Sequence, residues 1–411
     1  MKIGKLLLLG AIALGMVACN SEVPDVEKGA EATISVKVFP SSKSPVTRLA
    51  GDLSGDGVTP AGLAAESAIK NVEVWLFIGE TPDGYKKGDD GEAFVEGVIT
   101  TAGPKTMVVA ANANIGAVTN KAELLAKIQT PLSQDLTGGL VMTAEPVDMT
   151  LEGGHNQYGY KTTDTNPELS LYNEDACQIS LGTRLPITRI NARVALVGLS
   201  YDFNNPFYNR FELTEVAMFN ARKSSKLFGA SLVNGTEFLY GSAYPSTLHS
   251  YVGSAGYTGA YTAAVDASLA ELFQPNADLL APGLVNAVNA HYFYAFENTA
   301  NTNDNKEGTF IVLKGKLFKD DVQYIAEGLA TDAEGYTYYA IWVNDPIWSY
   351  NEGHTADGTI MRNTQYNITA TLKKAGNPTI DPAEEAQLDV WVEVAPWNVV
   401  TQTVIWETPT P

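Results

Sequence analysis

Apolar and polar residues alternate with a period of two in many short segments of this chain. In the first of them, Ile34, Val36 and Val38 alternate with Ser35 and Lys37. Such alternation is typical of a β-strand with one buried face. Similar strands are expected at residues 72–78, 106–111, 140–142, 190–196, 310–313, 338–343, 366–372 and 388–394. Because short strands separated by Gly and Pro turns prevail, the pattern predicts an all-β fold, mostly β with one or two short helices.

One segment has a helical pattern instead. Asn120 stands at the position of an N-cap, and Glu123 follows three residues later. Leu124, Leu125 and Ile128 would then share one face of a helix. A polar cap with a glutamate at the third helical position is a recognised start signal. The sequence therefore predicts a short helix after residue 120.

The length of 411 residues leaves room for two domains. The chain turns polar over residues 161–186, and a new strand begins at Ile190. We therefore expect a domain boundary at about residue 186, with β-sandwich domains at 49–185 and 186–411. Residues 240–290 are rich in Tyr, Ala, Gly and Ser without clear periodicity, and we interpret them as long loops that carry short elements.

The N-terminus has the features of a bacterial lipoprotein signal. Lys2 and Lys5 precede an apolar run from Leu6 to Val17, and Ala18 stands directly before Cys19. The run has about 12 residues, whereas spanning a bilayer takes roughly 20. We therefore expect residues 1–18 to be a signal peptide and Cys19 to be lipidated after cleavage. Lipid would then attach the precursor to a membrane.

A basic residue follows the first predicted strand at a point that a protease could reach. Residues 20–30 have the polar composition of a tether, and Pro40 to Pro45 ends the strand. Arg48 comes next, just before the Gly- and Asp-rich stretch 51–57. Exposed loops of this kind are preferred sites of proteolysis. Lys43 is a second basic residue in the same stretch.

Composition excludes several classes of function. The formal net charge of −20 disfavours binding to nucleic acid and to anionic membrane faces. Once Cys19 carries lipid, Cys177 is the sole free thiol, so an internal disulfide is excluded. Stability must therefore come from the hydrophobic core.

Catalytic and metal-binding motifs are absent from the sequence. The histidines are scattered, without metal-ligand spacing, at His155, His249, His291 and His354. Asp52 to Gly57 resembles the start of a calcium loop, but Leu63 stands where an EF-hand needs a bidentate glutamate. There is no nucleophile elbow, phosphate loop or dinucleotide fingerprint. We expect no catalytic residue, no cofactor and no metal, and hence not an enzyme.

The end of the chain is unusually rich in β-forming residues. Val390, Val392 and Val394 alternate with polar or aromatic residues, and a second apolar run at 399–406 includes Val399 and Ile405. An apolar terminal strand must pair with something. It either completes the chain's own sheet or pairs with another molecule.

Several segments along the whole length resemble the FimA-type major fimbrial subunits, or type V pilins, of the Porphyromonas/Bacteroides group. The N-terminal half contributes Thr106–Asn112, Gly139–Pro146 and Arg189–Arg193. The C-terminal half contributes Leu227–Asn234, Asp332–Gly335, Thr337–Tyr339, Arg362–Asn363, Tyr366 and Val394–Trp397. Their shared order from signal peptide to C-terminus makes the similarity specific.

The resemblance implies two tandem transthyretin-like β-sandwich domains and a defined assembly course. The precursor would reach the outer membrane as a lipoprotein. An extracellular trypsin-like protease would then cut after Arg48 and release residues 19–48, a propeptide that carries the lipid and the first strand. A C-terminal donor segment, 388–406, of a neighbouring copy would fill the vacated groove with Val390, Val392, Val394, Val399 and Ile405. This is donor-strand polymerisation into an open filament.

The implied function is a structural shaft subunit of a cell-surface fimbrium that mediates adhesion and colonisation. Expected partners are other copies of the chain, minor fimbrial subunits, the processing protease and the outer membrane, with surface receptors undefined. A tip or anchor subunit of the same family is an alternative. So is an outer-membrane lipoprotein that binds glycans through loop tyrosines such as Tyr257 and Tyr261.

Overall fold

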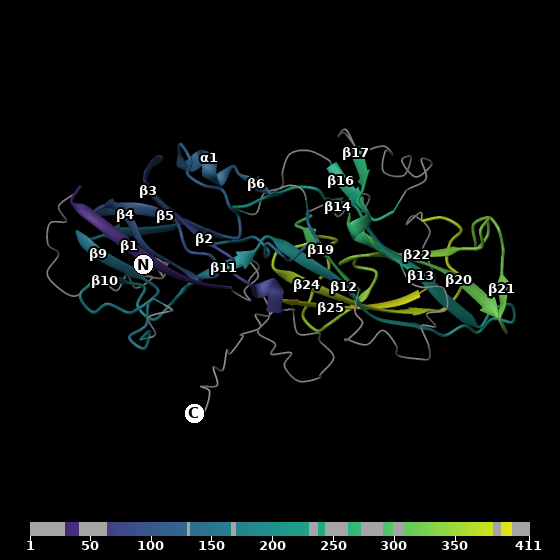
Figure 1. Ribbon diagram of the computed structural model, residues 1–411. Coiled ribbons are helices and arrows are strands. Elements are labelled where there is room, and N and C mark those ends of the chain that lie inside the picture. The colour runs from purple at the N-terminus through teal and green to yellow at the C-terminus, as the bar shows by residue number, and fades with distance from the viewer. Residues whose placement is uncertain are drawn as a thin grey trace, which may run out of the picture.

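The computed structural model describes residues 29–40, 64–129, 132–165, 170–229, 237–242, 262–272, 291–298, 308–380 and 388–396. Regular structure there is almost entirely β. The exceptions are the helix α1 (Lys121–Leu125) and two 3₁₀ turns, η1 (Ala64–Ser67) and η4 (Ala267–Leu269). Within these ranges no helix has the length and apolar character needed to cross a membrane. The strands gather in two domains (Figure 1), so the predicted mostly-β, two-domain fold is confirmed.

The N-terminal domain is built on a ten-stranded sheet. Its main path runs β10-β9-β1-β11-β7-β5-β2-β3, and β4 pairs with β1 while β8 pairs with β5. The strands are β1 (Glu31–Pro40), β2 (Val72–Ile78), β3 (Thr81–Lys87), β4 (Phe94–Thr101), β5 (Gly103–Ala111), β7 (Met142–Thr143), β8 (Val147–Leu151), β9 (Gly154–Tyr158), β10 (Cys177–Ile179) and β11 (Leu185–Arg189). The first described strand, β1, therefore lies inside the sheet and not at its edge.

Four further sheets account for the other strands of the described residues. One has the order β19-β12-β24-β25-β23, a second has β18-β13-β20-β21 with β22 paired to β20, and small sheets join β14-β16-β17 and β15-β6. The strands are β6 (Ile128–Gln129), β12 (Asn191–Tyr201), β13 (Arg210–Phe219), β14 (Ala221–Arg222), β15 (Ser225–Lys226), β16 (Glu237–Tyr240), β17 (Thr262–Val265), β18 (Ala270–Leu272), β19 (His291–Phe296), β20 (Phe310–Lys319), β21 (Val322–Tyr324), β22 (Thr337–Trp342), β23 (Ser349–Tyr350), β24 (Thr364–Leu372) and β25 (Leu388–Pro396). The last described strand is thus an inner strand of its sheet.

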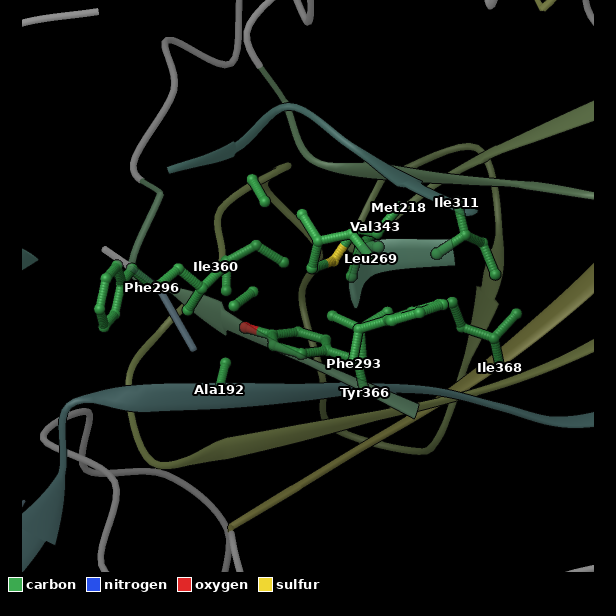
Figure 2. Close-up of a cluster of buried hydrophobic side chains, with 14 of the residues drawn as sticks. Ala192, Met218, Leu269, Phe293, Phe296, Ile311, Val343, Ile360, Tyr366 and Ile368 are labelled. Carbon is green, nitrogen blue, oxygen red and sulfur yellow. The ribbon is translucent and has the colours of Figure 1, made fainter. Parts of the chain in front are cut away.

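Two hydrophobic clusters hold the domains together, and β2 contributes to both. Val74 and Leu76 pack in the cluster beneath β1, whereas Trp75 and Phe77 join a larger cluster that continues through the C-terminal domain. This explains the nearly continuous apolar run of β2, because a strand covered on both faces has no polar side. Figure 2 shows the C-terminal part of the larger cluster, where Tyr366 lies among aliphatic and aromatic side chains.

The predicted helix is present but shorter than the pattern indicated. The Asn120 side chain accepts a hydrogen bond from the Glu123 N–H at 2.7 Å, as expected for an N-cap. The helix ends at Leu125, however, and Ile128 lies in β6, which pairs with β15. Including Ile128 in the helix was therefore wrong. Pairing with a strand from the other half of the chain overrides the helical spacing there.

A buried ion pair ties η1 to the strands where the two domains meet. Arg193 Nη1 lies 3.1 Å from Glu66 Oε1, and both side chains are almost fully buried. Arg189 donates from Nε to the Glu66 carbonyl oxygen at 2.9 Å and from Nη2 to Ser67 Oγ at 2.7 Å. The Tyr294 hydroxyl donates to Glu66 Oε1 at 2.9 Å. Burial lowers the pKa of Arg189 to about 10, although the nearby Glu66 charge opposes this shift.

Candidate functional site

Strand β1 has a hydrogen-bonded neighbour along each of its edges. One edge pairs antiparallel with β4, from Glu31 opposite Thr101 to Lys37 opposite Phe94. The other edge pairs parallel with β9 over residues 32–36 and then parallel with β11 over residues 38–40. We call the surroundings of β1, namely β4, β9, β11 and the side chains that cover its two faces, the seat of β1.

The inward face of β1 fills the core of the N-terminal domain. Ile34, Val36 and Val38 are at most 1 % exposed and pack against apolar side chains of β2, β4, β5 and β11. Full burial of an aliphatic side chain of this size contributes ~1.5–3 kcal/mol. Removal of β1 would therefore open an apolar surface through the middle of this domain.

The outward face of β1 is also covered, which the sequence did not indicate. Ser35 and Lys37 are only 3 % and 4 % exposed, so the prediction of one buried face was wrong. Thr33 Oγ1 lies 2.9 Å from His155 Nδ1, and Ser35 Oγ accepts a hydrogen bond from the Gly97 N–H. Over Lys37 the cover comes from the polar stretch that follows β9 and begins near residue 160.

Lys37 is the centre of a buried polar cluster on this outward face. Its Nζ lies 3.1 Å from Asp164 Oδ2, donates to the Ser170 carbonyl oxygen at 2.7 Å and sits 4.7 Å from the ring centroid of Tyr160. The Tyr160 hydroxyl and Ser170 Oγ are 2.7 Å apart, and Ser170 Oγ donates to Glu96. We call Glu96, Tyr160, Asp164 and Ser170 together the Lys37 site.

The electrostatics of the Lys37 site fit a buried cation. Burial lowers the pKa of Lys37, and the hydrogen bond and charge of Asp164 partly offset that shift. Burial alone would raise the pKa of Asp164. Hydrogen bonds from the Lys161 N–H and from Lys37, with the charges of Lys37 and Arg184, bring it below its ordinary value. Burial raises the pKa of Tyr160 to about 12. The site therefore presents an ionised carboxylate to the cation that β1 carries.

Three of the predicted donor residues, Val390, Val392 and Val394, lie in a different domain from the seat of β1. Strand β25 pairs antiparallel with β24 over its full length and parallel with β23. Val390 and Val392 are buried in the C-terminal core, and Val394 packs partly against it. β25 is therefore held in its own sheet, which is not the sheet that contains β1.

Other residues singled out in the sequence lie outside the described residues. These are Cys19, Lys43, Arg48, the Asp52–Leu63 stretch, Tyr257, Tyr261, Val399 and Ile405. Their roles stay predictions. Within the described ranges, no three His, Cys, Asp or Glu side chains are placed to hold a metal ion. The described residues therefore show one notable feature, which is that β1 is an inner strand of its sheet. Residues 41–63 are the covalent connection between β1 and the following part of the domain.

Comparisons with known proteins agree over the whole chain. A family model described as major fimbrial subunit protein (FimA) matches residues 32–189, and one described as FimA4 pilin C-terminal domain matches residues 188–397. The major fimbrium subunits FimA type-2 and type-3 of Porphyromonas gingivalis are 31% and 30% identical to it. Each alignment covers 99% of this chain and 100% of the relative.

Solved structures give the same result for the fold. A crystal structure of a fimbrilin (FimA) from Porphyromonas gingivalis superposes with a TM-score of 0.68 at 26% identity, covering 92% of this chain and 100% of that one. A putative cell adhesion protein from Parabacteroides distasonis superposes with a TM-score of 0.61 at 18% identity, covering 90% of this chain and 100% of that one. The second likeness concerns the fold alone.

Proposed function

Because this chain belongs to the FimA family of major fimbrial subunits, we propose that it is the shaft subunit of a fimbrium and polymerises by donor-strand exchange. Membership makes it a structural protein of the cell surface, assembled with other fimbrial subunits, and not an enzyme. The proposal concerns its role in the shaft and the way in which the subunits join.

The position of β1 is the observation that carries the proposal. β1 is hydrogen-bonded along both edges and covered on both faces, yet it precedes the rest of its domain in the chain. A cut within residues 41–63 would leave it held by non-covalent contacts alone. Its departure would expose two unpaired strand edges and an apolar surface, which is the requirement for adding a strand from another molecule.

Processing supplies the cut in this proposal. The precursor is lipidated at Cys19 and carried to the outer membrane, and a trypsin-like protease cleaves after Arg48. The fragment 19–48 then leaves with the lipid. Until that point β1 acts as a placeholder that prevents premature assembly.

The donor strand comes from the predicted segment 388–406 of a neighbouring copy. Strand β25 supplies the first part of that segment and already completes the chain's own sheet. Donation by Val390, Val392 and Val394 would require β25 to leave it. The apolar run 399–406, with Val399 and Ile405, follows β25 in the sequence, and its donation does not require β25 to leave its sheet. Since donor and seat are different surfaces, the contact is heterologous and builds an open filament.

Limited proteolysis of the purified precursor tests this assembly. A trace of trypsin-like protease should create a new N-terminus at Leu49, and unheated samples should show a ladder of multimers on a denaturing gel. The multimers should resist the detergent because a strand held along both edges is released slowly, which is kinetic stability. A clean cut at Leu49 that yields only monomers would contradict assembly by the subunit alone.

Arg48→Ala is expected to leave a lipidated monomer that forms no fibres. Without the cut, β1 stays covalently attached and keeps its seat occupied. Lys43→Ala, a basic residue in the same stretch, is the matched control and should form normal fibres. Fibre length by electron microscopy and N-terminal sequencing measure the outcome. Normal fibres from Arg48→Ala would place the cut elsewhere.

A further inference from the structure

The seat of β1 is not a uniform apolar groove, because the Lys37 site gives its outward side a negative charge. In the precursor this charge is matched by the Lys37 ammonium, which lies 3.1 Å from the Asp164 carboxylate. Both side chains are nearly buried, at 5% and 10% exposure. Once the strand that carries Lys37 leaves, the carboxylates of Asp164 and Glu96 stay in the seat. Any replacement strand must therefore satisfy or tolerate them.

We propose that the Lys37 site is a charge filter for the incoming strand. It admits a cationic or neutral side chain at the position of Lys37 and rejects a carboxylate there. The occupant that fits is residues 397–406 of a second copy. This inference rests on the proposed donor-strand exchange and adds the chemistry that selects the donor.

The structure shows how a neutral side chain is tolerated. Asp164 Oδ2 accepts a hydrogen bond from the Lys161 N–H at 2.9 Å, and Arg184 Nη2 lies 3.5 Å from Asp164 Oδ1. Arg184 Nε is buried and has no hydrogen-bond partner among the described residues. The guanidinium therefore has a donor to offer Asp164 after Lys37 leaves. A second carboxylate would instead be placed against Asp164 in a site that water reaches poorly.

Charge separates the two halves of the predicted donor segment. Residues 388–411 contain no lysine or arginine. In residues 388–396, Asp389, Trp391, Glu393 and Ala395 alternate in sequence with the valines, and two of these four residues are acids. A donor strand that turned its valines toward the core of its host would turn these four toward the Lys37 site. Residues 397–406 carry no charge at all, and their ten residues equal the length of β1. Whatever its register, this stretch brings no carboxylate into the Lys37 site.

Strand exchange on the full chain, cut within residues 41–63, tests the filter. The cut protein retains β1 as a bound fragment, and synthetic peptides of residues 29–40 compete with it in a known register. Wild-type and K37Q peptides should bind within about 10-fold of each other, whereas K37E should bind at least about 100-fold more weakly because like charges meet at close range. The peptide T33E, with the same charge on the same face beside His155, should behave like K37Q.

A protein variant and a second pair of peptides show whether charge or side-chain shape decides which strand binds. In D164N protein the deficit of the K37E peptide should shrink at least about 10-fold. The peptide of residues 397–411 should displace β1, whereas the peptide of residues 388–396 should not. The D389N/E393Q form of the second peptide should displace β1 better than its wild-type form does. Equal binding of K37Q and K37E would overturn the filter while leaving strand exchange intact. Failure of every peptide, including the wild-type 29–40 peptide, would instead overturn the proposed exchange itself.

Discussion

A chain that ends at Pro396 is expected to fold and to be processed, yet to form no multimers. It keeps β25 and with it the inner strand of the C-terminal sheet, so its melting temperature should stay close to that of the full chain. It lacks residues 397–411, and therefore has a seat for a donor strand but no strand to donate. Denaturing gels of unheated, protease-treated samples measure the result.

A mixing experiment sharpens this prediction. A processed chain ending at Pro396 can accept a donor strand but cannot pass one on, so it should stop growth and shorten fibres of the full chain in proportion to its share. Normal multimers from the truncated chain alone would show that β25 or another segment is the donor.

A chain that ends at residue 387 is the matched control. It also loses β25, whose Val390 and Val392 are buried in the C-terminal core. Burial of each such side chain contributes ~1.5–3 kcal/mol, and the ladder to β24 is lost as well. We expect a clearly lower melting temperature for this chain. If only residues 388–411 were deleted, a loss of multimers could come either from the missing donor strand or from the damaged C-terminal domain.

Replacing Glu66 with Gln is expected to lower the free energy of unfolding by about 3–5 kcal/mol, because it leaves the Arg193 guanidinium group buried without its carboxylate. It also removes the negative charge that favours the ionised form of Arg189, whose own hydrogen bonds to the Glu66 carbonyl oxygen and to Ser67 stay in place. Glu66 and Arg193 are almost inaccessible to solvent, so water cannot replace the lost partner. Chemical denaturation followed by tryptophan fluorescence measures the change. Asp202→Asn, which breaks an exposed pair with Lys373, should change the free energy by no more than about 1 kcal/mol.

A double variant tests the reason for this loss. Glu66→Gln combined with Arg193→Met removes both charges of the pair. Because a buried pair is often no more stable than an apolar replacement, the double variant should recover a substantial part of the loss. A double variant as unstable as the sum of both single variants would show that the charges act independently.

Local sequence patterns predicted the strands well where buried and exposed residues alternate regularly along the chain. The alternation of Ile34, Val36 and Val38 located β1, and the Asn120 cap with Glu123 located the start of α1. These signals work because the residues that decide the structure are neighbours in sequence. Ile128 shows the limit, since its partner strand β15 lies about a hundred residues further on.

The Lys37 site could not be predicted in this way. Lys37 has the spacing of a polar residue on the exposed side of a strand, and its partners Asp164 and Ser170 lie in a stretch that resembles a polar connection between domains. Nothing in the spacing links positions 127 residues apart. The same holds for Arg189 and Arg193. Both belong to a segment that carries the family resemblance, whereas their contacts with Glu66 follow from the fold alone.

The place of β1 in the sheet order has a mechanical consequence. Among the described strands, β9 and β10 connect to the rest of the main path only through β1, and β4 also pairs with β1. A replacement strand would thus hold the strands of its host domain together. A pulling force along that strand would act in shear on the hydrogen bonds at both of its edges. Many backbone hydrogen bonds would have to break together, whereas a strand peeled from one end loses them singly. A fibre joined in this way would carry tension through the cores of its subunits.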